Sequence, residues 1–197
     1  SESDPVNHPS QFYAATKRSN ELMAHSYSCI YGLKSTGVRF FTVYGPWGRP
    51  DMALFKFVKN IINKKLIDLF NYGNHVRDFS YIDDVIACLK KIKNKYPKKN
   101  KNLDSNNPSK SSATYQILNI GNESKVKLMD YIKEIEINLN NKAVKNFLKL
   151  QAGDIPNSYS KITNTNKIIK YNFKTDYKKS IKNFIKWFKE HYSKKID

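Results

Sequence analysis

The sequence has few cysteines and no long apolar run, and both shortages exclude classes of protein. Its 197 residues include two cysteines, Cys29 and Cys88, which lie too far apart for a zinc motif and are too few for a disulfide framework. We therefore expect two reduced thiols in a cytoplasmic protein and no bound metal. No stretch reaches the roughly 20 apolar residues that cross a bilayer, so we expect no membrane-spanning segment.

Arginine and acidic residues are also scarce, although the chain is strongly basic. There are 35 lysines and arginines against 17 acidic residues, which gives a net charge of +18. The arginines are Arg18, Arg39, Arg49 and Arg77, whereas proteins that read nucleic acid depend on arginine for bidentate contacts. We interpret the lysines as solvent-exposed cover and expect no nucleic-acid partner. A basic module for nucleic acid or an anionic surface is the alternative from another class.

Apolar residues recur first with the period of helices and then with that of strands, which is typical of a parallel α/β sheet. We expect helices at 13–31, 52–65, 83–95, 127–138 and 177–192, and strands at 35–44, 66–72, 77–82 and 115–120. The polar, low-complexity stretch 96–113 predicts a mobile surface loop. Asp83 and Asp84 begin a helix, where carboxylates are more often N-terminal charges than catalytic acids.

A Tyr-x-x-x-Lys pattern occurs at Tyr13 and Lys17. On a helix this spacing puts both side chains on one face. An ammonium group beside a tyrosine stabilises the phenolate and lowers the tyrosine pKa, which would make Tyr13 a usable base near neutral pH. The pattern alone has little specificity, because a chain this rich in tyrosine and lysine contains such pairs by chance. The residues around the pattern must therefore decide whether it is functional.

The residues around this pattern form longer strings with a family resemblance. The strings are Tyr13-Ala-Ala-Thr-Lys-Arg-Ser-Asn-Glu-Leu-Met-Ala-His25, Thr36-Gly-Val-Arg-Phe-Phe-Thr-Val-Tyr-Gly-Pro-Trp-Gly-Arg-Pro-Asp-Met-Ala-Leu-Phe-Lys-Phe57, Arg77-Asp-Phe-Ser-Tyr-Ile-Asp-Asp84, Leu118-Asn-Ile-Gly-Asn122, Leu128-Met-Asp-Tyr-Ile132 and Gln151-Ala-Gly-Asp154. In this order they resemble the UDP-glucuronate 4-epimerases of the extended short-chain dehydrogenase/reductase superfamily. The resemblance covers nearly the whole chain and is weakest in 96–114 and near the C-terminal end.

This resemblance implies an NAD-dependent isomerase that interconverts UDP-glucuronate and UDP-galacturonate by transient oxidation at C4. Tyr13 would be the base that takes the proton from the sugar 4-hydroxyl. Lys17 would hold the nicotinamide ribose and lower the tyrosine pKa. Phe40 would form a wall beside the nicotinamide, so Tyr13, Lys17 and Phe40 are the implied cofactor-binding residues.

The same resemblance implies a set of residues that bind UDP-glucuronate. Thr42 would bond the uronate carboxylate, and Arg49 and Arg77 would hold the diphosphate or the nucleotide, which suits the guanidinium fork. Asp154 would bond the uridine ribose, and Phe70 would lie against the uracil. Gln151 replaces the arginine usual in UDP-galactose 4-epimerases, which favours the glucuronate branch. The alternative is that Phe40 is ordinary strand core and Thr42 a turn residue.

For the fold, the resemblance implies the C-terminal part of a Rossmann-type parallel sheet, interleaved with a small α/β substrate-binding domain. Residues 1–50 would be the C-terminal part of the NAD-binding domain. Residues 51–197 would mainly bind the nucleotide sugar, with 82–95 and 115–120 as segments that can return to the NAD-binding domain. A homodimer is implied for the intact enzyme, so Leu22, Met23 and Tyr27 would face either a partner subunit or the core.

Two elements of the family are absent from these 197 residues. One is the glycine-rich pyrophosphate loop, and the other is the upstream Ser or Thr of the catalytic trio. We therefore expect a fragment of a longer enzyme that has neither turnover nor tight NAD affinity by itself. A nucleotide-sugar dehydratase or decarboxylase of the same superfamily is the alternative enzyme, since it also oxidises C4 with Tyr-x-x-x-Lys.

Overall fold

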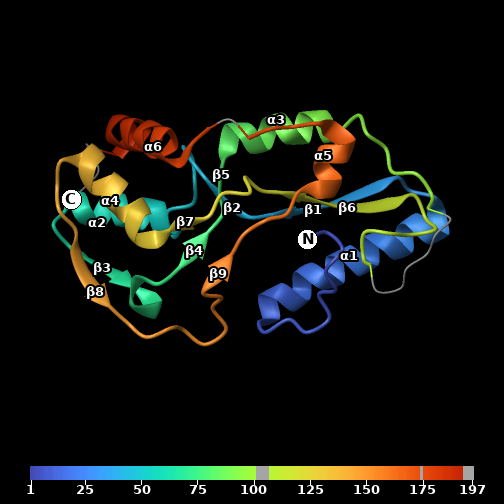
Figure 1. Ribbon diagram of the computed structural model, residues 1–197, viewed down its shortest axis with the longest axis horizontal. Helices are drawn as coiled ribbons and strands as arrows, with labels where there is room; N and C mark the ends of the chain where they lie inside the picture. Colours follow the sequence, from blue (N-terminus) through green and yellow to red (C-terminus); the bar gives the residue numbers. More distant parts are fainter. Residues whose placement is uncertain (101–106, 174, 193–197) are drawn as a thin grey trace. The chain divides into compact units, whose positions relative to one another are not determined.

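The computed structural model describes residues 1–100, 107–173 and 175–192 (Figure 1). The chain divides into two compact units, and each unit takes three segments of the sequence. Unit 1 consists of Ser1–Phe41, Ile86–Glu123 and Ser160–Asn172, and unit 2 of Thr42–Val85, Ser124–Tyr159 and Phe173–Asp197. Both units combine helices with parallel strands, so the expected α/β fold is confirmed.

Unit 1 is built on two parallel strands. Its elements are β1 (Ser35–Phe40), β6 (Tyr115–Ile120), α1 (Phe12–Tyr31), α5 (Thr163–Ile169) and most of α3 (Ile82–Ile92). The two strands pair from Ser35 opposite Tyr115 to Phe40 opposite Ile120. Helix α1 ends at Gly32, whose positive φ of 66° lets its amide donate to Ser28 O at 3.1 Å. The bounds predicted for α1, 13–31, and for β6, 115–120, are confirmed to within one residue.

Helix α1 directs a polar face toward its unit and an apolar face toward solvent. Ser28 is buried, whereas Leu22, Met23, Tyr27 and Ile30 are each more than half exposed. The expectation that these apolar residues pack in the core is therefore wrong, and the other expectation, a surface that faces a partner, stays open. A helix that is inverted in this way gains little from burial in its own chain, so polar contacts must hold it.

The described part of unit 2 contains three small sheets and three packed helices. The strand pairs are β2 (Thr42–Tyr44) with β5 (Phe79–Tyr81) and β3 (Leu66–Leu69) with β8 (Val144–Phe147), both parallel, while β4 (Val76–Arg77) lies between β7 (Val126–Lys127) and β9 (Asn157–Ser158). The helices are α2 (Ala53–Ile62), α4 (Leu128–Leu139) and α6 (Tyr177–Tyr192). Helix α4 contacts both α2 and α6.

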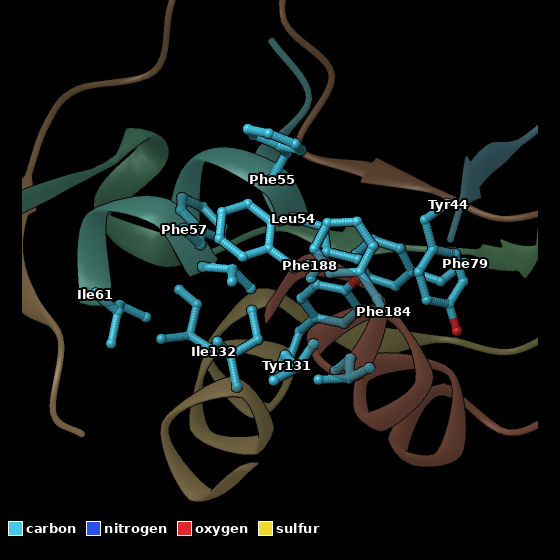
Figure 2. Close-up of a cluster of buried hydrophobic side chains, with 14 of the residues drawn as sticks. Tyr44, Leu54, Phe55, Phe57, Ile61, Phe79, Tyr131, Ile132, Phe184 and Phe188 are labelled. Carbon is cyan, nitrogen blue, oxygen red and sulfur yellow. The ribbon is translucent and has the colours of Figure 1, made fainter. Parts of the chain in front are cut away.

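The core of unit 2 is rich in aromatic rings, as Figure 2 shows. Phe55 of α2 and Phe188 of α6 meet edge to face at 5.0 Å, and Phe79 of β5 stacks on Tyr131 of α4 at 4.1 Å. Such pairs add to the stabilisation that burial alone provides. The lysines of α6 lie on its exposed side, at Lys178, Lys179, Lys182, Lys186 and Lys189, which confirms that they cover the surface of the fold.

Three predicted strands differ from the structure. Residues 35–44 form two strands, because Phe41 N donates to Ile120 O whereas Thr42 N donates to Asp78 O. Residues 77–82 are likewise interrupted, at Asp78. The strand expected at 66–72 ends at Leu69, and a 3-10 helix, η1 (Phe70–Gly73), follows with left-handed φ at Asn71 and Tyr72. An extended chain cannot continue through such residues.

The predicted loop 96–113 has neither helix nor strand at 96–100 and 107–113, and residues 101–106 lie outside the described residues. Cys29 and Cys88 are both free thiols, as expected. Within the described ranges, no helix combines the length and apolarity needed to cross a membrane. The same part of the chain contains no group of three or more His, Cys, Asp or Glu arranged to hold a metal ion.

Candidate functional site

Tyr13 and Lys17 lie in the first turns of α1 and are both exposed. The Lys17 ammonium nitrogen lies 5.1 Å from the centre of the Tyr13 ring, a distance at which a cation is attracted to the ring face. Tyr13 is 68% exposed, so a ligand can reach it. The helix thus presents a phenol and an ammonium group side by side, which is the arrangement that a tyrosine base requires.

An ion-pair network fixes the helix that carries this pair. Arg39 of β1 donates to both carboxylate oxygens of Glu21, at 2.7 and 2.9 Å, and Arg18 donates to the same carboxylate at 2.8 Å. Burial by itself would raise the pKa of Glu21, but hydrogen bonds from Arg39 and then Arg18 outweigh it and hold the pKa below its ordinary value of 4.5. Helical periodicity does not reveal the Arg39 contact, because Arg39 and Glu21 are 18 residues apart in the sequence.

A second polar contact joins α1 to the segment that precedes β6. His25 Nε2 lies 2.7 Å from Ser111 Oγ, and Tyr115 OH donates to the backbone oxygen of Glu21 at 3.1 Å. These groups and Arg18 line a cleft of about 330 Å³ in unit 1. Neither Tyr13 nor Lys17 lines this cleft. Its polar groups hold α1 in place and are separate from the Tyr13 and Lys17 pair.

Phe40 and Thr42 occupy the ends of successive strands. Phe40 is the last residue of β1 and is 51% exposed, so it is not buried strand core. Parallel sheets bind nucleotides at the carboxyl ends of their strands, and Phe40 lies at that end. Thr42 begins β2 and donates its amide to Asp78 O at 3.1 Å, so it is a strand residue and the turn alternative is wrong.

Arg49 lies on the loop between β2 and α2, and its side chain is 74% exposed. Its Nη2 lies 3.2 Å from Asp51 Oδ2 and donates to Met52 Sδ at 3.4 Å. The loop begins at Gly45, where φ is +141° and where a Cβ would lie 2.6 Å from Ile82 Cγ2. Glycine is therefore required at the point where the chain leaves β2.

Arg77 and Asp154 are brought together by the pairing of β4 with β9. Arg77 Nη2 donates to Asp154 Oδ1 at 3.2 Å, and Arg77 Nη1 donates to Pro156 O at 2.9 Å. Burial lowers the pKa of Arg77, and the carboxylate of Asp154 partly restores it. The structure thus joins two residues that the sequence assigned to one nucleotide sugar.

The same carboxylate has another partner that sequence reasoning missed. His75 Nε2 lies 3.0 Å from Asp154 Oδ2, and His75 is only 5% exposed. The local pattern held no signal for this histidine, since its partner comes 79 residues later. Phe70, the predicted uracil contact, lies in η1 and is half-buried.

The predicted residues fall into two sets. Tyr13, Lys17 and Phe40 belong to unit 1, and Thr42, Arg49, Phe70, Arg77 and Asp154 belong to unit 2. The exposed phenol, the ammonium group and the aromatic ring at a strand end fit the nicotinamide and ribose of NAD. A cradle for its pyrophosphate is not encoded in these 197 residues, since they lack the glycine-rich loop.

Comparison with known proteins identifies relatives along almost the whole chain. Residues 1–107 match the model of the NAD dependent epimerase/dehydratase family. The chain is 46% identical, over 98% of its length, to protein CapI of Staphylococcus aureus, of which it covers 59%. It is 40% identical, again over 98% of its length, to UDP-glucuronate 4-epimerase 4 of Arabidopsis thaliana, of which it covers 44%.

Solved structures of UDP-glucuronic acid 4-epimerases are also similar to this chain. The UDP-glucuronic acid 4-epimerase of Bacillus cereus, in complex with UDP-glucuronic acid and NAD, is similar with a TM-score of 0.81 and 28% identity. The match covers 94% of this chain and 55% of that one. The chain spans about half the length of the curated relatives that it matches.

Proposed function

Because this chain belongs to the NAD dependent epimerase/dehydratase family, we propose that it supplies the catalytic base and the nucleotide-sugar contacts of an enzyme that interconverts UDP-glucuronate and UDP-galacturonate. The observation that carries the proposal is 40% identity to a UDP-glucuronate 4-epimerase along 98% of the chain. The exposed Tyr13 and Lys17 pair on α1 supports it chemically.

In the proposed reaction each residue of unit 1 acts on the sugar or on the cofactor. NAD, when bound, would supply the reversible hydride-transfer chemistry at C4 of the sugar. Tyr13 takes the proton from the 4-hydroxyl and gives it back after inversion. Lys17 places a positive charge beside the Tyr13 ring, and it bonds the nicotinamide ribose. Phe40 shields the nicotinamide from water.

The residues of unit 2 bind the rest of the substrate. Thr42 donates its hydroxyl to the uronate carboxylate, and Arg49 and Arg77 hold the diphosphate. Asp154 accepts from the uridine ribose. Arg77 and Asp154 can bind each other and the substrate at the same time. A guanidinium has five N–H donors, and a carboxylate has about four acceptor positions. Phe70 packs against the uracil.

We also infer that the enzyme is a homodimer in the cytoplasm. The apolar surface on α1 is exposed to solvent and is formed by Leu22, Met23, Tyr27 and Ile30. Monomeric proteins rarely expose large apolar patches, and such patches mark interaction sites. A second copy of the helix would cover this surface with the same side chains. The free thiols Cys29 and Cys88 suit a reducing compartment.

Titration of the 197-residue chain with UDP-glucuronate tests the nucleotide-sugar half of the proposal. We expect saturable binding by calorimetry or by ligand-observed NMR, with weaker binding of UDP-glucose, which lacks the carboxylate that Thr42 would bond. GDP-mannose is the control for the uridine contacts and should bind weakest. The proposal is contradicted if the three ligands bind equally or if none binds up to millimolar concentration.

A further inference from the structure

The loop between β2 and α2 contains a tight turn with an unsuitable residue at its third position. Gly48 N donates to Gly45 O at 3.2 Å, so Gly45 to Gly48 form the turn, with Pro46 second and Trp47 third. Trp47 has φ of +63°. A turn with proline second and positive φ third ordinarily takes glycine or asparagine there. A bulky residue in this conformation is an outlier, so something outside the turn must stabilise it.

Two rings of α6 supply that stabilisation. The Trp47 indole meets Trp187 edge to face at 5.3 Å and His191 at 4.9 Å. Trp187 and His191 also stack on each other at 5.4 Å, and His191 Nδ1 lies 2.9 Å from Trp187 O. Trp187 and His191 thus form a platform under Trp47, and this platform is anchored in the core, since Trp187 is only 7% exposed. Edge-to-face pairs at these separations are favourable.

Core packing does not account for Trp47, because it stays 75% exposed. Its neighbours in the turn cannot take over the contact. A Cβ on Gly45 would lie 2.6 Å from Ile82 Cγ2, and one on Gly48 would lie 3.0 Å from Gly45 O. The turn therefore has one large side chain in its second half, and that side chain rests on α6.

The residue whose position depends on this contact is Arg49. It follows the turn directly, and its side-chain contacts are with Asp51 and Met52 of the same loop. Its backbone oxygen accepts from Met52 N at 3.1 Å, so a second turn follows the first. Arg49 therefore moves with the loop, and the loop is held to α6 by Trp47.

We propose that Trp47 is a positioning residue: seated on Trp187 and His191, it fixes the loop that aims Arg49 at the diphosphate. This rests on the proposed function, in which Arg49 binds the nucleotide sugar. It extends that site to α6, a helix that begins 130 residues after Trp47 in the sequence. The conformation at residue 47 favours glycine, so the contact of the ring with the helix has to offset the backbone strain.

The test compares Trp47→Gly with Trp47→Phe in the 197-residue chain by two measurements. The first is amide hydrogen exchange in 46–52, measured at the five residues that are not proline, and the second is the affinity for UDP-glucuronate. Trp47→Gly relieves the turn and removes the ring, so we expect at least tenfold faster exchange in 46–52 and about tenfold weaker binding. Trp47→Phe keeps a ring on the platform and should stay within threefold of the wild type in both measurements.

Two further variants control the test. Tyr72→Gly also removes an exposed aromatic residue with positive φ from unit 2, and it should leave exchange in 46–52 unchanged. His191→Ala removes one partner ring without altering the turn, and it should speed exchange in 46–52 even if Trp47→Gly does not fold. The chain has two tryptophans, so fluorescence of the Trp47 variants reports the packing of Trp187 alone.

Each outcome decides the proposal. Unchanged exchange in both Trp47→Gly and His191→Ala overturns it, and so does a Trp47→Phe variant that behaves like Trp47→Gly. Faster exchange with unchanged affinity also overturns it, because the loop would then be held for another purpose. If the wild-type chain does not bind UDP-glucuronate, the proposed function fails, while exchange in 46–52 still decides whether Trp47 holds the loop.

Discussion

The guanidinium of Arg77 lies 3.2 Å from the carboxylate of Asp154, measured from Nη2 to Oδ1. The family resemblance implies that both residues bind one nucleotide sugar, and the structure makes them direct neighbours. His75 reaches the other oxygen of the same carboxylate at 3.0 Å. Asp154 therefore holds both the Arg77 guanidinium and the buried His75 imidazole in place. Substitution of Asp154 should alter both ligand affinity and the free energy of unfolding.

Asp154→Asn should weaken UDP-glucuronate binding about tenfold, or roughly 1.4 kcal/mol. It should also lower the free energy of unfolding by about 1 kcal/mol, because it leaves the half-buried Arg77 without its carboxylate. Calorimetric titration and urea unfolding measure the two effects. His75→Gln is the control, since it leaves Arg77 paired, and its affinity should stay within threefold. Wild-type affinity in Asp154→Asn would contradict the ribose assignment.

Glu21 should make the anchoring of α1 sensitive to acid. Its pKa is lower in the folded chain than the ordinary 4.5, so its stabilisation is complete above that value and is lost as pH falls below it. Glu21→Gln should therefore cost about 1 to 2 kcal/mol at pH 7 and less at pH 3, because the stabilisation falls as the pH drops below 4.5. Both tryptophans lie in unit 2, so amide exchange of α1 is the measurement.

The exposed Glu190 provides the control for that comparison. Glu190→Gln should leave α1 exchange unchanged at both pH values. An equal cost of Glu21→Gln at pH 7 and pH 3 would mean that packing, and not the ionised carboxylate, holds the helix.

The two thiols should differ strongly in reactivity. Burial raises the pKa of Cys88 to about 11, only partly offset by Lys91, and its side chain is fully buried, whereas Cys29 is exposed. At pH 8 a disulfide reagent should label one thiol of the native chain rapidly and the second only in denaturant. Cys29→Ser should abolish the rapid phase, and rapid labelling that persists in this variant would contradict the burial of Cys88.

The apolar surface on α1 should cause self-association. Sedimentation velocity of the chain should show a dimer, and Met23→Asp should shift it to the monomer, because a charge in such an interface has no partner. Ile137→Asp is the matched control, as Ile137 is a similarly exposed apolar residue on α4. Dimers that survive Met23→Asp, or that Ile137→Asp removes, would place the interface elsewhere.

Long, strongly periodic elements could be predicted from the sequence. Helix α1 spans Phe12–Tyr31 against the expected 13–31, and β6 and α6 agree with their predicted bounds. In α1 the period agrees with the prediction, whereas the choice between a core-facing and a partner-facing apolar side could not be made from it, because the buried side is held by Arg39 and Ser111, which are distant in the sequence. Helical periodicity identifies the apolar face of a helix, but it does not show whether the core, a partner or solvent covers that face.

The rest depends on pairing between distant segments. Strands β7 and β9 have two residues each, too few for a period. The break at Phe41 follows from a change of hydrogen-bond partner from β6 to Asp78. In the candidate site, family strings pointed to Arg77 and Asp154, while His75 and Trp47 are recognisable only from contacts with residues far along the chain. The division into an NAD-binding and a sugar-binding domain stays a prediction.

The central claim is that this chain carries the base and the substrate contacts of a UDP-glucuronate 4-epimerase. Its most direct test is NMR-detected turnover by a chimera in which these 197 residues replace the matched segment of the Arabidopsis relative. We predict that UDP-galacturonate forms from UDP-glucuronate, and that Tyr13→Phe slows this at least about 100-fold, as loss of a general base does. A folded, NAD-loaded chimera that forms no UDP-galacturonate, or whose Tyr13→Phe variant is equally fast, would contradict the account.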